Sequence, residues 1–352
     1  MALFSKSQQP LIGIDITETS VKLIQLSKNG TRFSVDHYAV EPLPMGAVSE
    51  NIIKDVEKVS EVIRKAIKMS GTKSKWAAAA VADAHVISKL ITMPAGLTES
   101  ELEAQVELEA PNYIPYPIEE VSLDFLEMGL VPNNNQLIQV LLTASRVENV
   151  EQRQTVLELA GLSAKIIDVE GLAVERAFYL IKDEISPEPD SIIALFDLGA
   201  TTTNLNVMVN GKMVYTREQA FGGKQLTDEI MRRFGLGQLE AEMAKRNGGL
   251  PESYDIEVLE PFLETVVQQI SRLLQFFYAG TEYNKVDAIV LSGGTASLIG
   301  MVDRTEEQMG VKTILANPLN QMTLGKGVDA HQLAQVAPAL LLATGLALRG
   351  LE

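Results

Sequence analysis

The sequence contains no cysteine, and its three histidines, His37, His85 and His331, lie far apart. Without thiols the chain can form neither a disulfide nor a thiolate metal site, a composition that suits a reducing compartment. The scattered histidines argue against a histidine-based metal centre or catalytic triad. These absences exclude thiol chemistry and disfavour histidine chemistry.

Positive charge and long apolar runs are also scarce. Lys and Arg number 30 against 46 Asp and Glu, a formal net charge of −16, whereas non-specific nucleic-acid binding needs clustered cations. The longest apolar stretch, Ala337 to Leu348, is shorter than the ~20 residues that span a bilayer and predicts a buried helix. Met1 to Pro10 lacks the apolar segment of a secretory signal. We expect no nucleic-acid partner and no direct membrane insertion.

The 352 residues, 46% of them hydrophobic, exceed the usual size of one domain and predict a bilobal body. One design occurs twice: an apolar strand, then an aspartate, then a hydroxyl-rich turn that leads into a second strand. The first copy runs from Leu11 to Lys22 and the second from Ile192 to Asn204, with Asp15 aligned on Asp197.

The chemistry of these two turns suggests an anion and its metal. Backbone N–H groups and hydroxyls in such turns can bind anionic oxygens. A carboxylate beside the turn repels phosphate but can bind the water shell of a phosphate-bound Mg²⁺. Two facing copies predict a nucleoside triphosphate held between related domains, although capping of the strand ends would also explain both aspartates.

Two glycine pairs add to this pattern. Ser292-Gly293-Gly294-Thr295 follows a predicted strand, and its glycines permit close backbone approach to a flat ring or a ribose. Phe221-Gly222-Gly223 opens a predicted helix, whose N–H groups favour negative charge or ring edges. Each pair alone is ordinary loop chemistry, but with the internal repeat they favour a nucleotide site.

Hydrophobic periodicity predicts the elements between the two copies. Apolar spacing predicts a helix over Ile52 to Met69 and a small-residue strand over Trp76 to Val81. A β-α-β-β-α unit then extends from about 86 to 165, with Thr98 and Glu101 in a capping-box pattern at its first helix. The size of this unit predicts a compact insert.

The order of these elements resembles the actin-like ATPase superfamily, and the position of the insert resembles its FtsA branch. In its short sequence motifs, the whole chain is similar to the PilM family of type IV pilus assembly. The residues that carry this likeness are Gly13-Ile14-Asp15, Ser20-Val21-Lys22, Tyr113-Ile114-Pro115-Tyr116-Pro117, Asp168-Val169-Glu170, Asp197-Leu198-Gly199, Ala337-Pro338-Ala339 and Gly345-Leu346-Ala347.

The resemblance implies an α/β protein with a bilobal actin-like ATPase fold, made of duplicated ribonuclease-H-like domains and an FtsA-type inserted subdomain. The four implied subdomains are 1–85 plus 326–352, 86–165, 166–214 plus 286–325, and 215–285.

The resemblance also implies ATP with Mg²⁺ in the interlobe cleft, with Asp15 and Asp197 facing the metal through water. The other positions implied to contact the nucleotide are Thr19, Ser20, Lys22, Gly199, Ala200, Thr201, Gly222, Gly223, Gly293, Gly294 and Thr295. Glu170 is the candidate to position an attacking water, with Asp168 second and a plain surface carboxylate as the alternative. Thr17 stands where the superfamily usually has glycine, so a different turn geometry is expected there.

For function, the resemblance implies a cytoplasmic scaffold of the pilus assembly platform, peripheral to the inner membrane through a transmembrane partner. It implies binding of the N-terminal cytoplasmic peptide of PilN beside the insert, and contacts with other platform proteins and motor ATPases. Trp76, Tyr113 and Tyr116 are either aromatic anchors for the peptide or packing residues. One acidic candidate is weak support for turnover, so we expect tight ATP binding with slow or undetectable hydrolysis.

Other classes stay open. An FtsA-like filament protein would self-associate head to tail, and such contacts need not close. A small-molecule kinase of the same superfamily would need a catalytic aspartate and polar clusters for a sugar or acid, and none stands out. A chaperone is disfavoured because no substrate-binding domain follows Glu352, and for the same reason the amphipathic membrane helix of FtsA is not expected.

Overall fold

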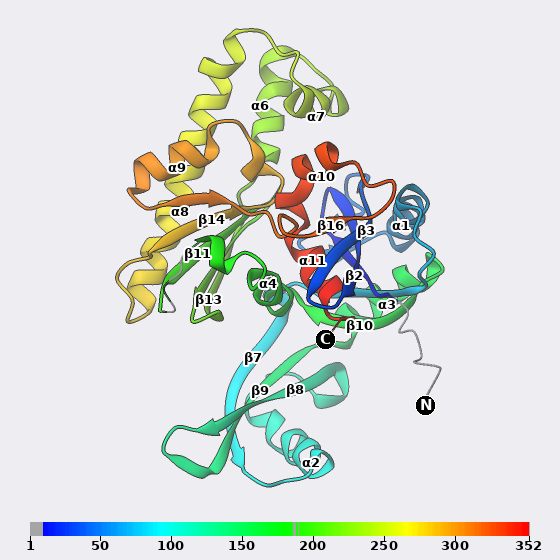
Figure 1. The fold of residues 1–352 in the computed structure, drawn as a ribbon, viewed down its shortest axis with the longest axis vertical. Helices are drawn as coiled ribbons and strands as arrows, with labels where there is room; N and C mark the ends of the chain where they lie inside the picture. Colours follow the sequence, from blue (N-terminus) through cyan, green and yellow to red (C-terminus); the bar gives the residue numbers. More distant parts are fainter. Residues whose placement is uncertain (1–9, 186–187, 189, 352) are drawn as a thin grey trace.

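The computed structural model describes residues 10–185, 188 and 190–351. Figure 1 shows two α/β lobes side by side and a smaller unit that projects away from them. The first lobe combines the blue start and the red end of the chain, and the second is built from the green-to-orange middle. Segments from both ends of the sequence therefore share one lobe.

The first lobe contains a six-stranded sheet in the order β10-β6-β1-β2-β3-β16. Its strands are β1 (Ile12–Ile16), β2 (Ser20–Asn29), β3 (Arg32–Pro42), β6 (Trp76–Val81), β10 (Ser163–Val169) and β16 (Thr323–Leu324). β1, β2 and β3 form an antiparallel meander, whereas β6 runs parallel to β1. The first hydroxyl-rich turn is the connection between β1 and β2.

Helices pack on both faces of this sheet. α1 (Val56–Ser70) and α3 (Val147–Leu159) share one apolar core with β1 and β2. The closing segment of α10 (Ala330–Val336), a 3₁₀ turn (Ala337–Leu340) and α11 (Leu341–Leu348) shares another core with β2 and β3. The same strands can contribute apolar side chains to both cores, because successive side chains of a strand point to opposite faces of the sheet.

The closing segment lies very close to the sheet. A Cβ added to Gly13 would lie 2.1 Å from the carbonyl oxygen of Ala343, so glycine lets α11 sit directly on β1. By length and composition Ala330–Leu348 could cross a membrane, but 61% of its most apolar window is buried inside the lobe. The stretch from 337 to 348 is thus a core element, as the sequence predicted.

The second lobe repeats the arrangement of the first. Its sheet has the order β13-β12-β11-β14-β15, with β11, β12 and β13 in an antiparallel meander and β14 parallel to β11. The strands are β11 (Ile192–Leu198), β12 (Thr203–Val209), β13 (Lys212–Gln219), β14 (Ala288–Ser292) and β15 (Thr313–Leu315). β14-β11-β12-β13 matches β6-β1-β2-β3, so the sequence repeat is also a structural repeat.

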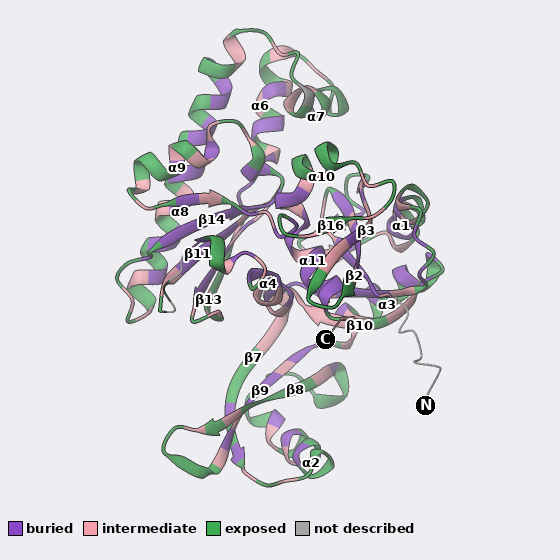
Figure 2. Ribbon diagram, in the orientation of Figure 1, coloured by how far each residue is buried: buried purple, intermediate pink, exposed green. Residues whose placement is uncertain are grey.

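The helices of the middle of the chain surround this second sheet. They are α4 (Glu170–Phe178), α5 (Lys182–Ile185), α6 (Lys224–Phe234), α7 (Gln238–Asn247), α8 (Glu260–Gly280), preceded by a π-helical turn (Asp255–Leu259), and α9 (Met301–Met309). The long helix α8 contributes more buried residues to one apolar core than any other element does, and α4 packs on the opposite face. Figure 2 shows β11 and β14, in the middle of this sheet, largely buried.

The projecting unit is a three-stranded antiparallel sheet in the order β7-β9-β8, covered on one face by α2. Its elements are β7 (Val86–Pro94), α2 (Glu99–Glu109), β8 (Val121–Val131) and β9 (Asn134–Arg146). Thr98 and Glu101 form the capping box that the sequence predicted. The unit spans 86–146, because α3, which we had expected within the insert, packs in the first lobe. β10, most of which we had assigned to the second lobe, also joins the first-lobe sheet.

A small hairpin of β4 (Val48–Ser49) and β5 (Ile52–Ile53) stands where a helix was expected to begin. α1 starts only at Val56, because the Asp55 side chain accepts a hydrogen bond from the N–H of Lys58 and caps the helix. Glu50 and Asn51 at the hairpin tip have φ of 53° and 60°. Positive φ is costly for side chains other than glycine, so this tip is strained.

Candidate functional site

The two repeated aspartates line one cleft. Asp15 at the end of β1 and Asp197 at the end of β11 border a space of about 430 Å³, counting its open mouth. The other lining residues are Lys22, Asp83, Glu170, Val174, Asn204, Asn206, Ala339, Leu341 and Leu342. The fold therefore brings together Asp15, Lys22, Asp197 and Glu170 from separate elements, with carboxylates and amides on its walls.

Lys22 is the cation of this cleft. β1 and β2 pair Asp15 with Lys22 directly, and the Lys22 Nζ lies 2.7 Å from the Asp15 Oδ2. Burial lowers the pKa of Lys22, but Asp15 and Asp197 outweigh it and raise the pKa above its ordinary value. Burial also raises the pKa of Asp197, against an opposing effect of Lys22. Lys22 is therefore positively charged and is held between the two aspartates.

The first turn closes on its own side chains. The Thr17 hydroxyl donates to the Ser20 carbonyl at 3.0 Å, and the Ser20 N–H donates to the Thr17 Oγ1 at 3.2 Å. Thr17 is not among the residues with positive φ in the described part of the chain. The threonine thus needs no glycine-like backbone, because its hydroxyl closes the turn. Ser20 is buried, whereas Thr19 is exposed.

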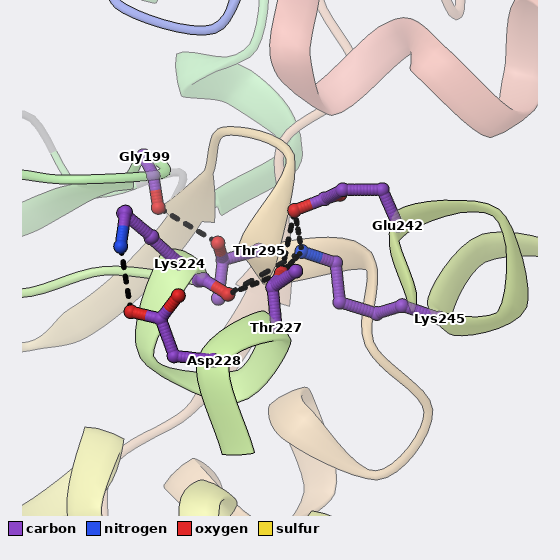
Figure 3. A network of polar contacts seen from close by, with 8 residues as sticks. Gly199, Lys224, Thr227, Asp228, Glu242, Lys245 and Thr295 are labelled. Atoms are coloured by element: carbon purple, nitrogen blue, oxygen red, sulfur yellow. Dashed lines mark hydrogen bonds and ion pairs between the residues drawn. The ribbon is translucent and has the colours of Figure 1, made fainter. Parts of the chain in front are cut away.

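The second turn packs against both glycine pairs. The Gly199 carbonyl accepts hydrogen bonds from the Gly223 N–H at 3.0 Å and from the Thr295 hydroxyl at 2.7 Å. A Cβ at Gly223 would lie 2.3 Å from the Thr295 Oγ1, and one at Gly222 would lie 2.5 Å from the Ala200 carbonyl oxygen. Three loops spread over about a hundred residues therefore form one surface, part of which is drawn in Figure 3.

The remaining predicted residues sit around this surface. Gly293 has φ of 88°, and a Cβ there would lie 2.5 Å from the Leu198 carbonyl oxygen, so no other residue fits its place. Gly294 faces open space, because a Cβ there would meet nothing within 4 Å. Thr201 is partly buried in the second turn.

A polar cluster on α6 and α7 completes this wall and was not foreseen from the sequence. The Lys245 Nζ donates to the Thr227 hydroxyl at 2.7 Å and to the Gly223 carbonyl at 3.3 Å, and lies 3.0 Å from the Glu242 Oε1 (Figure 3). Burial lowers the pKa of Lys245, while Glu242 opposes the shift. A Glu and a Lys three residues apart on a helix was the available signal.

Glu170, the first residue of α4, has a pKa well above the ordinary value of a glutamate. Burial, together with the charges of Asp15 and Asp83, raises the pKa of Glu170 to about 8, against the opposing Arg153. Burial raises the pKa of Asp83 to about 6, although the Gly171 N–H donates to its Oδ1. With a pKa of about 8, Glu170 holds a proton at neutral pH, and a protonated carboxyl cannot act as a general base.

Asp168, the second catalytic candidate, has another role. Its Oδ2 lies 3.2 Å from the Arg176 Nη1, and its Oδ1 accepts from the Val169 N–H. It is not among the residues that line the cleft. Asp168 therefore joins the end of β10 to α4.

The donor set suits a hydrated cation rather than a directly bound one. In the described part of the chain, no three His, Asp or Glu side chains are arranged to hold a metal ion. The cleft still gathers four carboxylates, Asp15, Asp83, Glu170 and Asp197, against one ammonium. Mg²⁺ usually keeps several of its waters and takes few protein carboxylates, so these residues fit a water-bridged Mg²⁺.

The strained hairpin tip joins the two lobes. The Glu50 N–H donates to the Glu18 Oε1 in the first turn at 2.6 Å. The Asn51 Nδ2 donates to the Glu218 Oε2 on β13 at 3.1 Å, and the Arg153 guanidinium donates to the Asn51 carbonyl at 3.0 Å. One turn thus contacts the first hydroxyl-rich turn, α3 and the opposite lobe.

Comparison with known proteins supports the fold. The sequence model of the family described as "Type IV pilus assembly protein PilM" matches residues 13–351. A solved PilM-PilN type IV pilus biogenesis complex contains a chain that is 29% identical, with a TM-score of 0.80 over 98% of this chain and 99% of that one.

More distant relatives share the architecture. The ethanolamine utilization protein EutJ from Carboxydothermus hydrogenoformans is 16% identical, with a TM-score of 0.57 over 96% of this chain and 89% of that one. The cell division protein FtsA from Enterococcus hirae is 23% identical, over 92% of this chain and 82% of FtsA. The expectation of a bilobal actin-like ATPase fold is confirmed.

Proposed function

The chain belongs to the PilM family of type IV pilus assembly proteins, and from this membership we propose that it is a nucleotide-binding scaffold of the pilus assembly platform. Mg·ATP binds in the interlobe cleft, and the insert carries the surface for the cytoplasmic N-terminal peptide of PilN. The protein acts in the cytoplasm and is held at the inner membrane by that partner.

The convergence of both repeat copies on one cleft supports the nucleotide half of this proposal. Asp15 and Asp197 hold the waters of the metal, Lys22 and the two turns hold phosphate oxygens, and the glycine loops with Thr295 hold the nucleoside. Lys245 and Glu242 extend the surface that holds the nucleoside, because the Lys245 ammonium donates a hydrogen bond to the Gly223 carbonyl in one of the glycine loops. The metal supplies charge neutralisation of the phosphates when bound.

Calorimetry tests this half directly. We expect Mg·ATP to bind the wild-type chain, and Asp197→Asn to lose most of the gain in affinity that Mg²⁺ provides. Glu188, outside the cleft, offers a matched carboxylate-to-amide control. Absence of any heat from Mg·ATP with the wild-type protein would disprove the nucleotide site.

The surface of the insert supports the peptide half. Leu90 on β7 and Leu126 on β8 both lie opposite Leu141 of β9, and both are more than half exposed. Tyr113 and Tyr116 are also exposed, whereas Trp76 is partly buried under the Lys165 side chain. α2 packs on the other face of the sheet, so the leucine row stays open. An extended apolar peptide fits this exposed row.

A binding assay with a labelled PilN N-terminal peptide tests the location. Leu126→Asp places a charge in the apolar row and should abolish binding. Leu239→Asp, at a 70% exposed leucine on α7 of the second lobe, should leave binding unchanged. Equal binding by all three proteins would place the peptide elsewhere.

Slow turnover follows from the proton on Glu170. A protonated carboxyl cannot take a proton from an attacking water. Hydrolysis therefore requires a state of the site in which the pKa of Glu170 is lower. We expect phosphate release well below one turnover per second. A measured rate of several per second would contradict the scaffold role.

A further inference from the structure

Asn206 is a buried amide whose side-chain oxygen has no hydrogen-bond partner among the described residues. It lies on β12, opposite Leu195 of β11 and Thr216 of β13. Its side chain is 3% exposed and lines the cleft, yet its Oδ1 accepts no hydrogen bond from the described residues. Buried side-chain acceptors nearly always have a partner, and one left unpaired is costly.

The position would suit an apolar residue if it served only the core. Asn204, Asn206 and Met208 share one face of β12, because side chains alternate along a strand. Met208 belongs to the apolar core that also contains Leu195. The face changes from apolar to amide only where β12 reaches the cleft, so the polar group at 206 faces the ligand space.

We propose that Asn206 binds a water of the hydration shell of the divalent cation that accompanies the nucleotide. This inference rests on the proposed nucleotide site. Metal-bound water is a strong hydrogen-bond donor, and the Asn206 Oδ1 is an acceptor with nothing to accept. Asn204 pairs in register with Asp197, which puts the amides of β12 beside the aspartate that faces the metal.

An amide has an advantage over a carboxylate at this place. Four carboxylates and one ammonium already line the cleft, so a further negative charge would add repulsion when the cleft is empty. The amide oxygen accepts a hydrogen bond without adding charge. Asn206 therefore contributes to cation affinity only through the waters that the cation orders.

Calorimetric titration with ATP, in Mg²⁺ and in EDTA, tests the proposal. Asn206→Leu keeps a similar size and removes the acceptor. We expect the gain in ATP affinity that Mg²⁺ provides to fall about tenfold or more, as for loss of one charge-assisted hydrogen bond, while affinity in EDTA stays unchanged. Thr344→Val is the matched control, because its buried hydroxyl is also unpaired but lies outside the cleft.

A second variant separates the two functions of the amide. Asn206→Asp keeps the acceptor and removes the donor, so it should retain or increase the Mg²⁺ dependence. If its gain in affinity from Mg²⁺ instead falls as in Asn206→Leu, the amide nitrogen rather than the oxygen makes the contact and the proposal is wrong.

Three further outcomes complete the test. An unchanged Mg²⁺ dependence in Asn206→Leu overturns the inference alone, provided that its melting temperature matches that of the control. If Asn206→Leu melts far below the control, Asn206→Asp decides by its Mg²⁺ dependence. Absence of Mg·ATP binding by the wild-type protein overturns both this inference and the nucleotide site.

Discussion

Replacing Glu170 by Gln should change how the stability of the free protein depends on pH. The folded state raises the pKa of Glu170 from 4.5 to about 8 through burial and the neighbouring Asp15 and Asp83. A raised pKa in a carboxyl means that its stabilising effect is complete below the unfolded pKa and is lost as pH rises through the folded pKa. Wild-type stability should therefore fall between pH 4.5 and 8.

The size of the effect follows from the shift. Each unit of pKa difference corresponds to about 1.4 kcal/mol, so ionisation of Glu170 costs the folded state about 3 kcal/mol between pH 5.5 and 8. Gln has the same shape and does not titrate. The free energy of unfolding of Glu170→Gln should fall about 3 kcal/mol less than that of the wild type over this range.

Urea unfolding in EDTA at several pH values from 5.5 to 8 measures this difference. Glu103→Gln, at an exposed position on α2, is the control and should follow the wild-type curve. Asp83 keeps its own contribution in all three proteins, so it does not confound the comparison. If the free energy of unfolding changed with pH equally in wild type and Glu170→Gln, the argument that the folded state raises the pKa of Glu170 would be refuted.

Three further predictions concern the framework. Gly345→Ala should lower the free energy of unfolding by about 3 kcal/mol, because the new Cβ would lie 1.9 Å from the Ala173 carbonyl oxygen; an unchanged urea midpoint would contradict this packing. Glu50→Gly should raise it by about 1 kcal/mol, because glycine relieves the positive φ and keeps the backbone hydrogen bond; a lower melting temperature would count against strain. Asn51→Ala removes the bond to Glu218 and should speed amide hydrogen exchange at the cleft, and unchanged exchange would show that the lobes are held elsewhere.

The internal repeat could be predicted because its features are local in the sequence. Apolar strands, aspartates and hydroxyl-rich turns recur with the same spacing, and both meanders form where this spacing places them. The strand Trp76–Val81 has the predicted bounds, and a helix begins directly after Phe221-Gly222-Gly223 as predicted. Asp15 and Asp197 were placed in one cleft because a duplicated fold makes two equivalent strand ends face each other.

Other features depend on contacts that no local pattern encodes. Apolar Ile52 and Ile53 fit a helical spacing, yet the Asp55 cap leaves them in a hairpin. α3 and β10 pack in the first lobe because their apolar residues meet α1 and β6, which lie some 80 to 100 positions earlier in the chain. The contact of Lys245 with Gly223 likewise exists only after α7 folds back on α6.

The packing of α11 on β1 determines when the first lobe can finish folding during synthesis. The apolar surface of β1 and β2 that receives Ala343 and Ala347 leaves the ribosome more than 250 residues before its cover does. At about 5–20 residues per second, a nascent chain carries that uncovered surface for roughly 10 to 50 seconds. Leu341 of the same helix also completes a core of the second lobe, so neither lobe can finish folding before the last residues of α11 are made.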